Sequence, residues 1–311
     1  MRVLITGAAG YIGSKLTNYF VKNNIHVTAI DSLLHNQHHF VEEVFKRPWC
    51  SFHQRDAGNI PRHLLKRADV IYPLAALVGA PLCDKTPEEA IRVNTTEVAN
   101  LMKLLSPNQR VIFPNTNSGY GATGKDICTE ETPLNSVSVY GTSKEFAEEI
   151  VLEHENSTVF RLATVFGTSV RPRIDLMVNN FVYLAKTTGK IEVFEGHFRR
   201  NFVHLIDVVS TFAKCIEDSR TKQQVYNLGN DSLNMTKLDL AYKIAKHLPV
   251  EVSESSGLDP DKRDYIVSSN KLLSLGYETK IDLDYGITEV SNMLDELDLN
   301  NPKLVKAMRN V

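Results

Sequence analysis

Short apolar runs alternate with helical patterns along the first half of the chain. Residues 88–105 and 143–155 carry apolar side chains at helical spacing, and residues 11–23 do so at Ile12, Leu16, Tyr19 and Phe20. Alternation of strands and helices predicts an α/β fold, in which helices cover both faces of a parallel sheet. The predicted strands are residues 3–6, 25–30, 51–54, 70–74, 111–114 and 158–163.

The regular alternation weakens after residue 166, where glycines and prolines separate shorter elements. We therefore expect residues 1–166 to hold most of the sheet and residues 167–311 to form mainly a smaller lobe. A segment near 201–229 is expected to return to the sheet. Since parallel sheets bind ligands at the carboxyl ends of their strands, the residues that follow each strand are the candidate site residues.

Composition narrows the class of protein. A chain of 311 residues with 42% hydrophobic residues can bury one large core, and a net charge of -2 gives no basic surface for nucleic acid. The sequence contains no long apolar run of the kind that predicts a membrane span or an export signal. We therefore expect a soluble, cytoplasmic protein.

Cysteine and histidine positions give no sign of a metal site. The four cysteines are scattered without a C-x-x-C pair, which favours reduced thiols. His35, His38 and His39 lie in a polar segment that we interpret as a solvated loop, and we predict no structural or catalytic metal.

A glycine-rich turn follows the first predicted strand directly. Gly7 permits a tight turn, Gly10 lets the backbone approach a phosphate, and Gly13 lets the following helix pack closely on its strand. The backbone of Tyr11 and Ile12 begins that helix, whose dipole and free N–H groups favour a negatively charged pyrophosphate. The turn predicts a dinucleotide site.

Asp31 ends the second predicted strand, about 20 residues beyond the glycines. A carboxylate there can accept hydrogen bonds from both ribose hydroxyls and repels a 2′-phosphate, which favours NAD over NADP. A turn or helix-cap role for Asp31 is the alternative.

Tyr140 and Lys144 stand four residues apart, so a helix over this segment projects both side chains from one face. A nearby ammonium, and the positive charge of an oxidised nicotinamide, favour the phenolate and are expected to lower the pKa of Tyr140 from its usual value near 10. An ordinary amphipathic helix with a surface lysine has the same spacing.

A hydroxyl follows the predicted strand at 111–114. Thr116 would lie at the carboxyl edge of the sheet, where it could hold a substrate hydroxyl while Tyr140 removes its proton. Ser118 is the rival for this role, and both hydroxyls could instead satisfy backbone groups of a turn.

Together these residues resemble the extended short-chain dehydrogenase/reductase superfamily, in its NAD-dependent nucleotide-sugar epimerase/dehydratase branch. The T-G-x-x-G-x-x-G motif matches residues 6–13, Y-x-x-x-K matches residues 140–144, and a hydroxyl before a Tyr-Gly pair matches Thr116 before Tyr120. The resemblance implies a Rossmann-type doubly wound parallel sheet with a smaller C-terminal substrate-binding lobe. Residues 1–166 would form the NAD-binding domain.

The resemblance also assigns cofactor residues. It implies that Asp56 contacts the adenine, that Ala75 and Ala76 line the pyrophosphate, and that Asn94 is a structural or cofactor-site asparagine. Tyr140 and Lys144 would lie against the nicotinamide half, with Lys144 on its ribose. Family members often dimerise through two helices of each subunit, which here would be residues 88–105 and 143–155.

Matches in the second half imply a nucleotide diphosphate sugar as substrate. The segment Asn179-Asn180 resembles a helix start that contacts the diphosphate, and Arg200 belongs to a segment that resembles R-x-F-V-H-x-x-D-V. Arg200 and Arg263 are the candidates for the diphosphate, since guanidinium groups suit phosphate oxygens. In the same segment we expect His204 to be a buried histidine and Asp207 a helix cap, both structural.

The residues before Tyr120 favour one reaction over others in this family. Dehydratases of the family carry Asp-Glu at the positions of Asn117 and Ser118, and neither residue found here has a pKa suited to moving a carbon-bound proton. We therefore expect an epimerase that oxidises the sugar transiently at C4 and forms a 4-keto intermediate. A 4-dehydrogenase or reductase with net redox, and a catalytically inactive NAD-binding regulatory protein, are the alternatives.

Overall fold

The structure is a computed structural model that describes residues 1–257 and 263–310. Its centre is a sheet of seven strands, all paired in parallel. In spatial order the strands are β11 (Gln224–Leu228), β7 (Ser157–Leu162), β5 (Arg110–Thr116), β4 (Val70–Pro73), β1 (Arg2–Thr6), β2 (His26–Asp31) and β3 (Cys50–Gln54). The predicted α/β fold with a parallel sheet is confirmed, and β11 is the strand that the second half contributes.

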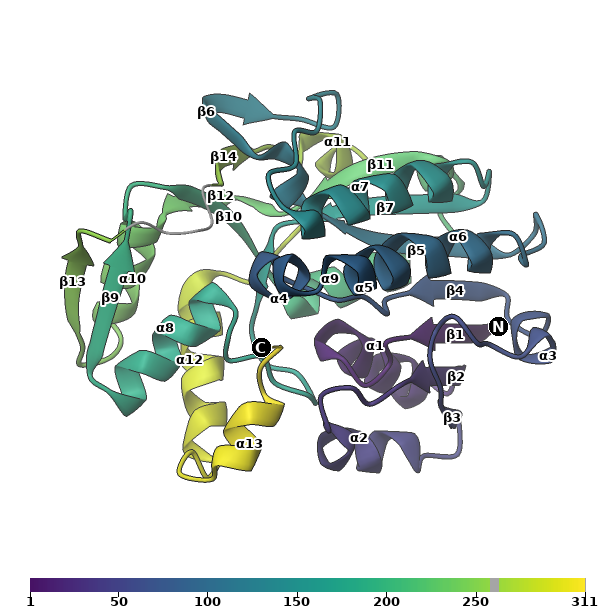
Figure 1. Cartoon of the computed structure of the whole chain (residues 1–311), viewed down its shortest axis with the longest axis horizontal. Helices are drawn as coiled ribbons and strands as arrows, with labels where there is room; N and C mark the ends of the chain where they lie inside the picture. Colours follow the sequence, from purple (N-terminus) through teal and green to yellow (C-terminus); the bar gives the residue numbers. More distant parts are fainter. Residues whose placement is uncertain (258–262, 311) are drawn as a thin grey trace.

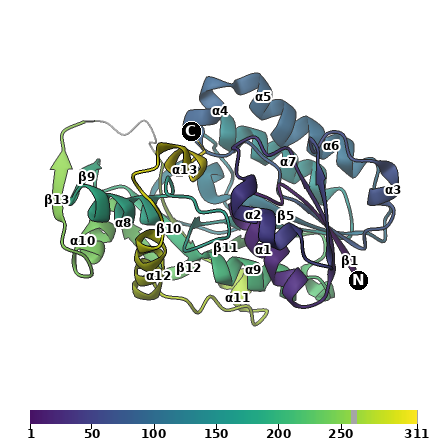
Figure 2. The ribbon, with the colours of Figure 1, turned by 90° about the horizontal axis from the view of Figure 1, so that it is seen from below.

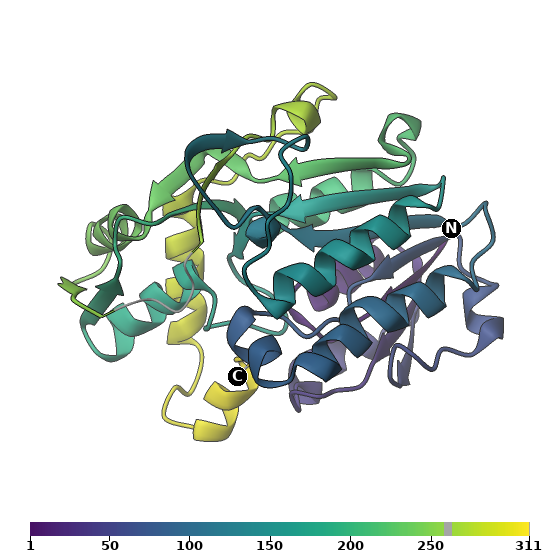
Figure 3. The same ribbon diagram turned by 45° about the horizontal axis from the view of Figure 1, so that its top comes forward.

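Alternate residues of each strand face opposite sides of this sheet, as the pleat requires. In β1, Val3 and Ile5 pack with the helices of one face, whereas Leu4 packs on the other. Figures 1, 2 and 3 show the two helical layers. One face carries α1 (Tyr11–Lys22), α2 (His38–Phe45) and α9 (Leu205–Lys214), and the other carries α3 (Arg62–Leu65), α6 (Glu97–Met102) and α7 (Val139–Leu152).

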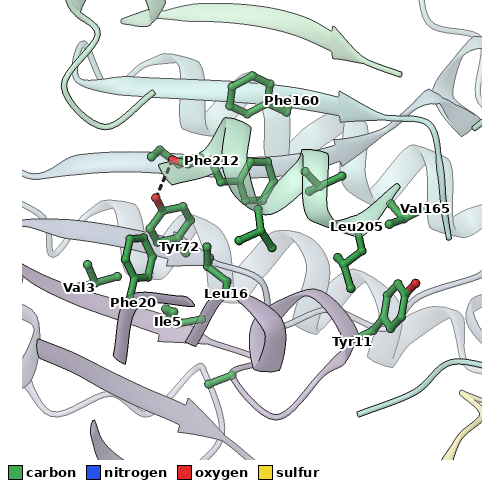
Figure 4. Close-up of a cluster of buried hydrophobic side chains, with 14 of the residues drawn as sticks. Val3, Ile5, Tyr11, Leu16, Phe20, Tyr72, Phe160, Val165, Leu205 and Phe212 are labelled. Carbon is green, nitrogen blue, oxygen red and sulfur yellow. Dashed lines mark hydrogen bonds between the residues drawn. The ribbon is translucent and has the colours of Figure 1, made fainter. Parts of the chain in front are cut away.

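The largest core cluster lies under α1 and α9. Leu16 and Phe20 of α1 meet Phe212 of α9 and Phe160 of β7, all almost completely buried (Figure 4). In this cluster the Tyr72 hydroxyl donates to the carbonyl of Phe212 at 2.8 Å. This bond lets a tyrosine be buried without an unsatisfied hydroxyl, and so fixes α9 against the sheet.

The smaller lobe has its own apolar cluster, contributed by residues between Phe166 and Met308. The lobe lies beside the sheet, on the side toward which the arrowheads of β1 and β4 point in Figure 1. Three small sheets accompany it: β12 (Asn230–Thr236), β10 (Arg199–His204) and β8 (Thr164–Phe166); β13 (Glu251–Ser255) and β9 (Lys190–Phe194); β14 (Asp264–Val267) and β6 (Ala122–Cys128). Its helices are α8 (Met177–Thr187), α10 (Lys237–Ala245), α12 (Leu283–Asp295) and α13 (Pro302–Ala307), whereas α11 (Asn270–Leu273) packs beside β11 of the central sheet.

Several predicted elements differ in their bounds. The helix expected over 88–105 is divided into α5 (Pro87–Ile91), a π-helical turn at Arg92–Thr96 and α6, and it follows the short α4 (Ala80–Lys85). The helix expected from 143 begins at Val139, because the Ser138 hydroxyl accepts the N–H of Gly141 at 3.2 Å and caps it.

Two surface predictions are wrong. His38 and His39 do not lie in a loop but begin α2. On α1, Tyr19 is exposed, whereas Tyr11 and Val21 are buried. The buried face of the helix is the one that carries Thr17 and Phe20, and Tyr19 lies outside it. Among the described residues, none of the helices has the length and apolar character needed to cross a membrane.

Candidate active site

The glycine turn between β1 and α1 has the geometry of an anion cradle. Gly7 has a φ of +65°, and a Cβ there would lie 2.7 Å from the amide nitrogen of Ala75. A Cβ on Gly13 would lie 2.1 Å from the carbonyl oxygen of Gly7, whereas one on Gly10 would meet only that oxygen, at 3.1 Å. Gly10 caps α1 without a side chain, so the first-turn N–H groups have no side-chain acceptor. These features fit a bound pyrophosphate.

Tyr11 and Ile12 contribute to this turn through their backbone. The Tyr11 ring points away from the turn, and its hydroxyl donates to the carbonyl of Gly167 at 2.7 Å. Burial raises the pKa of this phenol. The side chain of Tyr11 therefore connects α1 to the segment after β8. Ile12, the next residue of this helix, is half-buried.

Asp31 lies at the carboxyl end of β2, beside the glycine turn. Its carboxylate accepts the N–H of Ala9 at 2.9 Å and the N–H of Leu33 at 2.8 Å, and Gln37 donates to it at 3.3 Å. Burial raises the pKa of this carboxyl, while the two N–H donors and the charge of Arg171 lower it. Asp31 thus joins the glycine turn to the loop after β2. Its Oδ1 accepts from both Leu33 and Gln37, whereas Oδ2 accepts from Ala9 and keeps a lone pair for a ribose hydroxyl.

The loop after β4 forms the next part of the edge. Ala75 donates its N–H to the hydroxyl of Thr6 at 3.1 Å, and Ala76 is half-buried beside it. Asn94, in the π-helical turn, is fully buried and bonds both backbone groups of Leu77 (2.8 and 3.0 Å) and the Ser143 hydroxyl (3.0 Å). Asn94 therefore fastens this loop to α7.

Asp56 follows β3 and is exposed. It accepts the N–H of Gly58 at 2.8 Å and lies 3.5 Å from a nitrogen of Arg92. Backbone and side-chain hydrogen bonds and the Arg92 charge outweigh partial burial and lower the pKa of Asp56. Beside it, burial and the Asp56 charge raise the pKa of Glu97 to about 7.

The structure brings Thr116 and Tyr140 together. Thr116 ends β5 and Tyr140 lies in the first turn of α7, and the Thr116 side chain is close enough to the phenol to lower its pKa. The Thr116 hydroxyl is also 2.8 Å from the Ser118 hydroxyl and accepts the Ser118 N–H at 3.1 Å. Both candidate hydroxyls therefore lie here, and of the two, Thr116 is the one that acts on the pKa of the phenol.

The pKa of Tyr140 differs from the expected direction. Burial raises it to about 12, and this effect exceeds the lowering by Arg263, Arg173 and the Thr116 hydrogen bond. The expected lowering by Lys144 does not occur, because removal of the phenol from water dominates. At neutral pH the phenol is protonated in this structure, and Arg173 is an influence that the sequence did not suggest.

Lys144 is buried on α7, one turn after Tyr140. Its Nζ lies 3.8 Å from the centroid of the Phe113 ring, which offers a cation–π contact. Burial lowers the pKa of Lys144 to about 7, although the Glu148 carboxylate raises it. The ammonium thus titrates near neutral pH, which is unusual for a lysine and typical of functional sites.

Arg263 and Arg200 lie on the substrate side of this edge. The Arg263 guanidinium donates to the Ser118 hydroxyl, so it lies beside the Thr116 and Tyr140 pair. Arg200 is 1% exposed and donates to the carbonyls of Arg199, at 2.9 Å, and of Arg263. Arg200 therefore holds the backbone that presents Arg263.

Asn179 and Asn180 begin α8, and their contacts are with the segment before the helix. Asn179 is buried; its oxygen accepts the Gly167 N–H at 3.1 Å and its nitrogen donates to the Arg173 carbonyl at 2.9 Å. Asn180 is half-buried and donates to the carbonyl of Ile174 at 3.0 Å. Both side chains fix the segment that carries Arg173.

His204 is buried, as expected, whereas the helix-cap role predicted for Asp207 is wrong. His204 is fully buried and caps α9 through Nδ1, which accepts the N–H of Ile206 at 3.2 Å. Asp207 does not cap this helix, because its carboxylate accepts the N–H groups of Lys280 and Ile281 at 3.1 and 3.0 Å.

Comparison with known proteins shows which proteins this chain is similar to. The model of the NAD dependent epimerase/dehydratase family matches residues 3–229. UDP-glucuronic acid decarboxylase 4 of Arabidopsis thaliana is 26% identical over 304 residues, 92% of this chain and 67% of the plant protein. UDP-glucose 4-epimerase of Lactobacillus helveticus is 25% identical over 312 residues, 90% of this chain and 92% of that protein.

Solved structures share the fold. UDP-glucuronic acid 4-epimerase from Bacillus cereus, in complex with UDP-glucuronic acid and NAD, superposes with a TM-score of 0.83 at 22% identity. The match covers 95% of this chain and 99% of that one.

Proposed function

The chain belongs to the NAD dependent epimerase/dehydratase family, and we propose that it is a nucleotide-sugar epimerase that inverts one carbinol carbon, C4, through transient oxidation. The observation that supports this proposal is the proximity of the Thr116 and Tyr140 side chains at the carboxyl edge of the sheet, one helical turn before buried Lys144. Relatives in this family act on UDP-glucose and UDP-glucuronic acid by their names, which favours a nucleotide diphosphate sugar.

NAD is the cofactor of the family, and the residues of this chain fit it. The glycine turn and the first turn of α1 would hold the pyrophosphate, Asp31 the adenosine ribose, and Tyr140 with Lys144 the nicotinamide half. We propose Asp56, Ala75, Ala76 and Asn94 as further residues of the same site. When bound, NAD supplies a hydride acceptor and a positive charge close to the phenol.

Tyr140 acts as the base in this proposal. The phenol must first give up its own proton to solvent, which the positive charge of bound NAD would favour. The phenolate oxygen would then accept the proton of the sugar C4 hydroxyl, with the nearby Thr116 hydroxyl aligning the two oxygens. The C4–H electron pair departs as hydride, which leaves a 4-keto sugar. For inversion, the keto group turns its other face to the same hydride donor, and Tyr140 returns the proton.

The substrate-binding residues have separate places in this proposal. We assign Asn179, Asn180 and Arg200 to the wall that faces the diphosphate, because they fix the segment before α8 and the start of β10. The contact of Arg263 with Ser118 favours a place beside the sugar ring over the diphosphate role.

Decarboxylation of a nucleotide uronic acid is the second candidate, since Arg263 could pair with a C6 carboxylate next to the reacting carbon. Oxidation at C4 then gives a β-keto acid, which loses CO2, takes a proton at C5 and regains the hydride at C4. Asn117 and Ser118 supply no acid for that proton, so epimerisation is favoured.

A 4-dehydrogenase with net redox would instead release the keto sugar and leave NADH. A regulatory protein without turnover does not require the Thr116–Tyr140 contact, so this contact disfavours that alternative.

We also propose a homodimer formed by the helices around α5, α6 and α7. Ile91 and Phe146 are 51% and 53% exposed on this surface, which is unusual for side chains of this size. Sedimentation equilibrium would test it, with a monomer as the contrary result.

The test of the proposed function is incubation of pure protein and NAD with UDP-glucose, UDP-galactose, UDP-glucuronic acid and dTDP-glucose, followed by proton NMR. The C4 epimer of one sugar is expected, without accumulation of NADH. A pentose product would favour decarboxylation, and stoichiometric NADH would favour the dehydrogenase. No change in any sugar would leave the regulatory alternative.

A further inference from the structure

A buried carboxylate lies directly behind the Tyr140 and Lys144 pair. Glu148 is on α7, one turn beyond Lys144, and is only 4% exposed. Its two oxygens accept hydrogen bonds from the Arg161 guanidinium, the shortest at 2.6 Å, and one accepts from the Asn115 amide. The mechanism proposed above does not use this group.

The Asn115 contact links Glu148 to the end of β5. Asn115 precedes Thr116, and its side-chain oxygen accepts the N–H of Thr116 at 2.8 Å. One path of hydrogen bonds therefore runs from the α7 carboxylate, through the Asn115 side chain, to the backbone of Thr116. The same carboxylate thus contacts the helix of Tyr140 and the strand of Thr116, whose side chains must meet for proton transfer.

Arg161 of β7 compensates the buried charge. Its guanidinium is 7% exposed, bonds both oxygens of Glu148 and donates to the Tyr120 hydroxyl at 3.0 Å. Tyr120 in turn donates to the side-chain oxygen of Asn227 at 2.7 Å. A buried ion pair of this kind holds a fixed geometry and is costly to break by removal of one partner.

Glu148 is also the carboxylate that acts on Lys144. The Phe113 ring of β5 lies against the Lys144 ammonium, and Tyr140 and Glu148 lie one turn before and after Lys144 on α7. Arg161 of β7 pairs with Glu148, and Cys83 of α4 lies near the phenol. Of these, Glu148 supplies the negative charge that opposes the burial of the ammonium. The sequence spacing of residues 144 and 148 places both on one helical face.

We propose that Glu148 is a positioning residue of this active site: its carboxylate fixes the end of β5 against α7 and supplies the charge opposite the Lys144 ammonium. This inference rests on the proposed function for its kinetic consequence, but its effect on Lys144 does not depend on any substrate.

The experiment compares Glu148→Gln with Glu149→Gln, which makes the same change at the next, exposed position of α7. The direct readout is the titration of the Lys144 side-chain nitrogen, followed by NMR in protein with isotope-labelled lysine. Lys144→Arg assigns the signal. Loss of the Glu148 charge is expected to lower the Lys144 titration midpoint by about one pH unit, and the Glu149 variant should match the wild type.

Turnover of the sugar nucleotide provides the second readout. In Glu148→Gln, kcat is expected to fall at least about tenfold with little change in KM, and the alkaline limb of its pH profile should move to lower pH. If the single variant does not fold because Arg161 is left unpaired, Glu148→Gln with Arg161→Met removes both charges. The double variant should still lose kcat, because the Asn115 link is still weakened.

The two proposals fail in different ways. A folded Glu148→Gln protein with the Lys144 midpoint and kcat profile of the wild type would overturn the role of Glu148. A shifted Lys144 midpoint in a protein that converts no nucleotide sugar would leave the role of Glu148 in charge and geometry intact, and would overturn the proposed function.

Discussion

The Thr116 hydroxyl lies beside the Tyr140 phenol, although one residue ends a central strand and the other begins a helix on the face of the sheet. This contact requires that β5 and α7 meet at the carboxyl edge of the sheet, where ligands of such folds bind. It turns two separate sequence features into one reactive pair.

Replacement of Tyr140 by Phe removes the base and leaves the shape of the site. We expect kcat to fall by roughly 10²- to 10⁴-fold, which is typical of the loss of a general base, while NAD still binds. Tyr285→Phe is the matched control, since Tyr285 is 50% exposed. Near-normal turnover in Tyr140→Phe would refute the assignment.

Thr116→Val should be far more harmful than Ser118→Ala. The valine keeps the volume but removes the hydroxyl that lies near the Tyr140 phenol, whereas Ser118 contacts the Thr116 hydroxyl. Thr116→Ser, which restores a hydroxyl, should recover most of the activity. If Ser118→Ala is the more damaged variant by kcat, the two hydroxyls have exchanged roles.

The stability of the protein should rise with pH above neutrality because of Lys144. Its pKa is about 7 in the fold and near 10.5 when unfolded, so between these values the unfolded chain binds the extra proton. Unfolding therefore becomes less favourable as pH increases through this window. Lys144→Met should remove this dependence, measured by urea denaturation at several pH values, and exposed Lys103→Met should retain it.

Asp31→Asn should weaken NAD binding by roughly tenfold to a hundredfold, the usual effect of losing a charged hydrogen-bond acceptor. Discrimination against NADP should also decrease, because the charge that repels a 2′-phosphate is gone. Calorimetric titration with both dinucleotides measures the change, and exposed Asp126→Asn is the control. Unchanged NAD affinity in a folded variant would exclude the ribose role.

Arg171 joins the C-terminal segment to the rest of the fold. It is 1% exposed, and it donates to the side-chain oxygen of Asn310 and to the carbonyls of Ala307 and Arg309, at 2.7 to 3.1 Å. Arg171→Met should cost roughly 3 kcal/mol, because buried acceptors lose their donor. Thermal unfolding and faster hydrogen exchange in α13 would show it. The exposed Arg62→Met should leave both unchanged.

The sequence predicted the parts of this structure that follow from local spacing. The alternation of Val3, Leu4 and Ile5 and the glycines at 7, 10 and 13 indicated β1 and α1 correctly, because strand pleat and turn sterics act between neighbours. Since carboxyl ends of parallel strands share one edge, Thr116 and Tyr140 could be expected to meet.

Long-range contacts and burial could not be predicted in this way. The π-helical turn at Arg92–Thr96 leaves no mark in an apolar spacing, and the pairing of Arg263 with Ser118 joins distant segments. The pKa of Tyr140 was expected in the wrong direction, because the sequence shows the cationic neighbour but not the loss of water around the phenol.

The most direct test of the central claim is NMR of a nucleotide sugar labelled with deuterium at C4, incubated with the protein and NAD. If the deuteride leaves C4 and the same deuteride returns to C4, the product is a C4 epimer that keeps its deuterium at C4. An epimer that carries solvent hydrogen at C4 or C5, or a substrate that remains unchanged, would contradict the account.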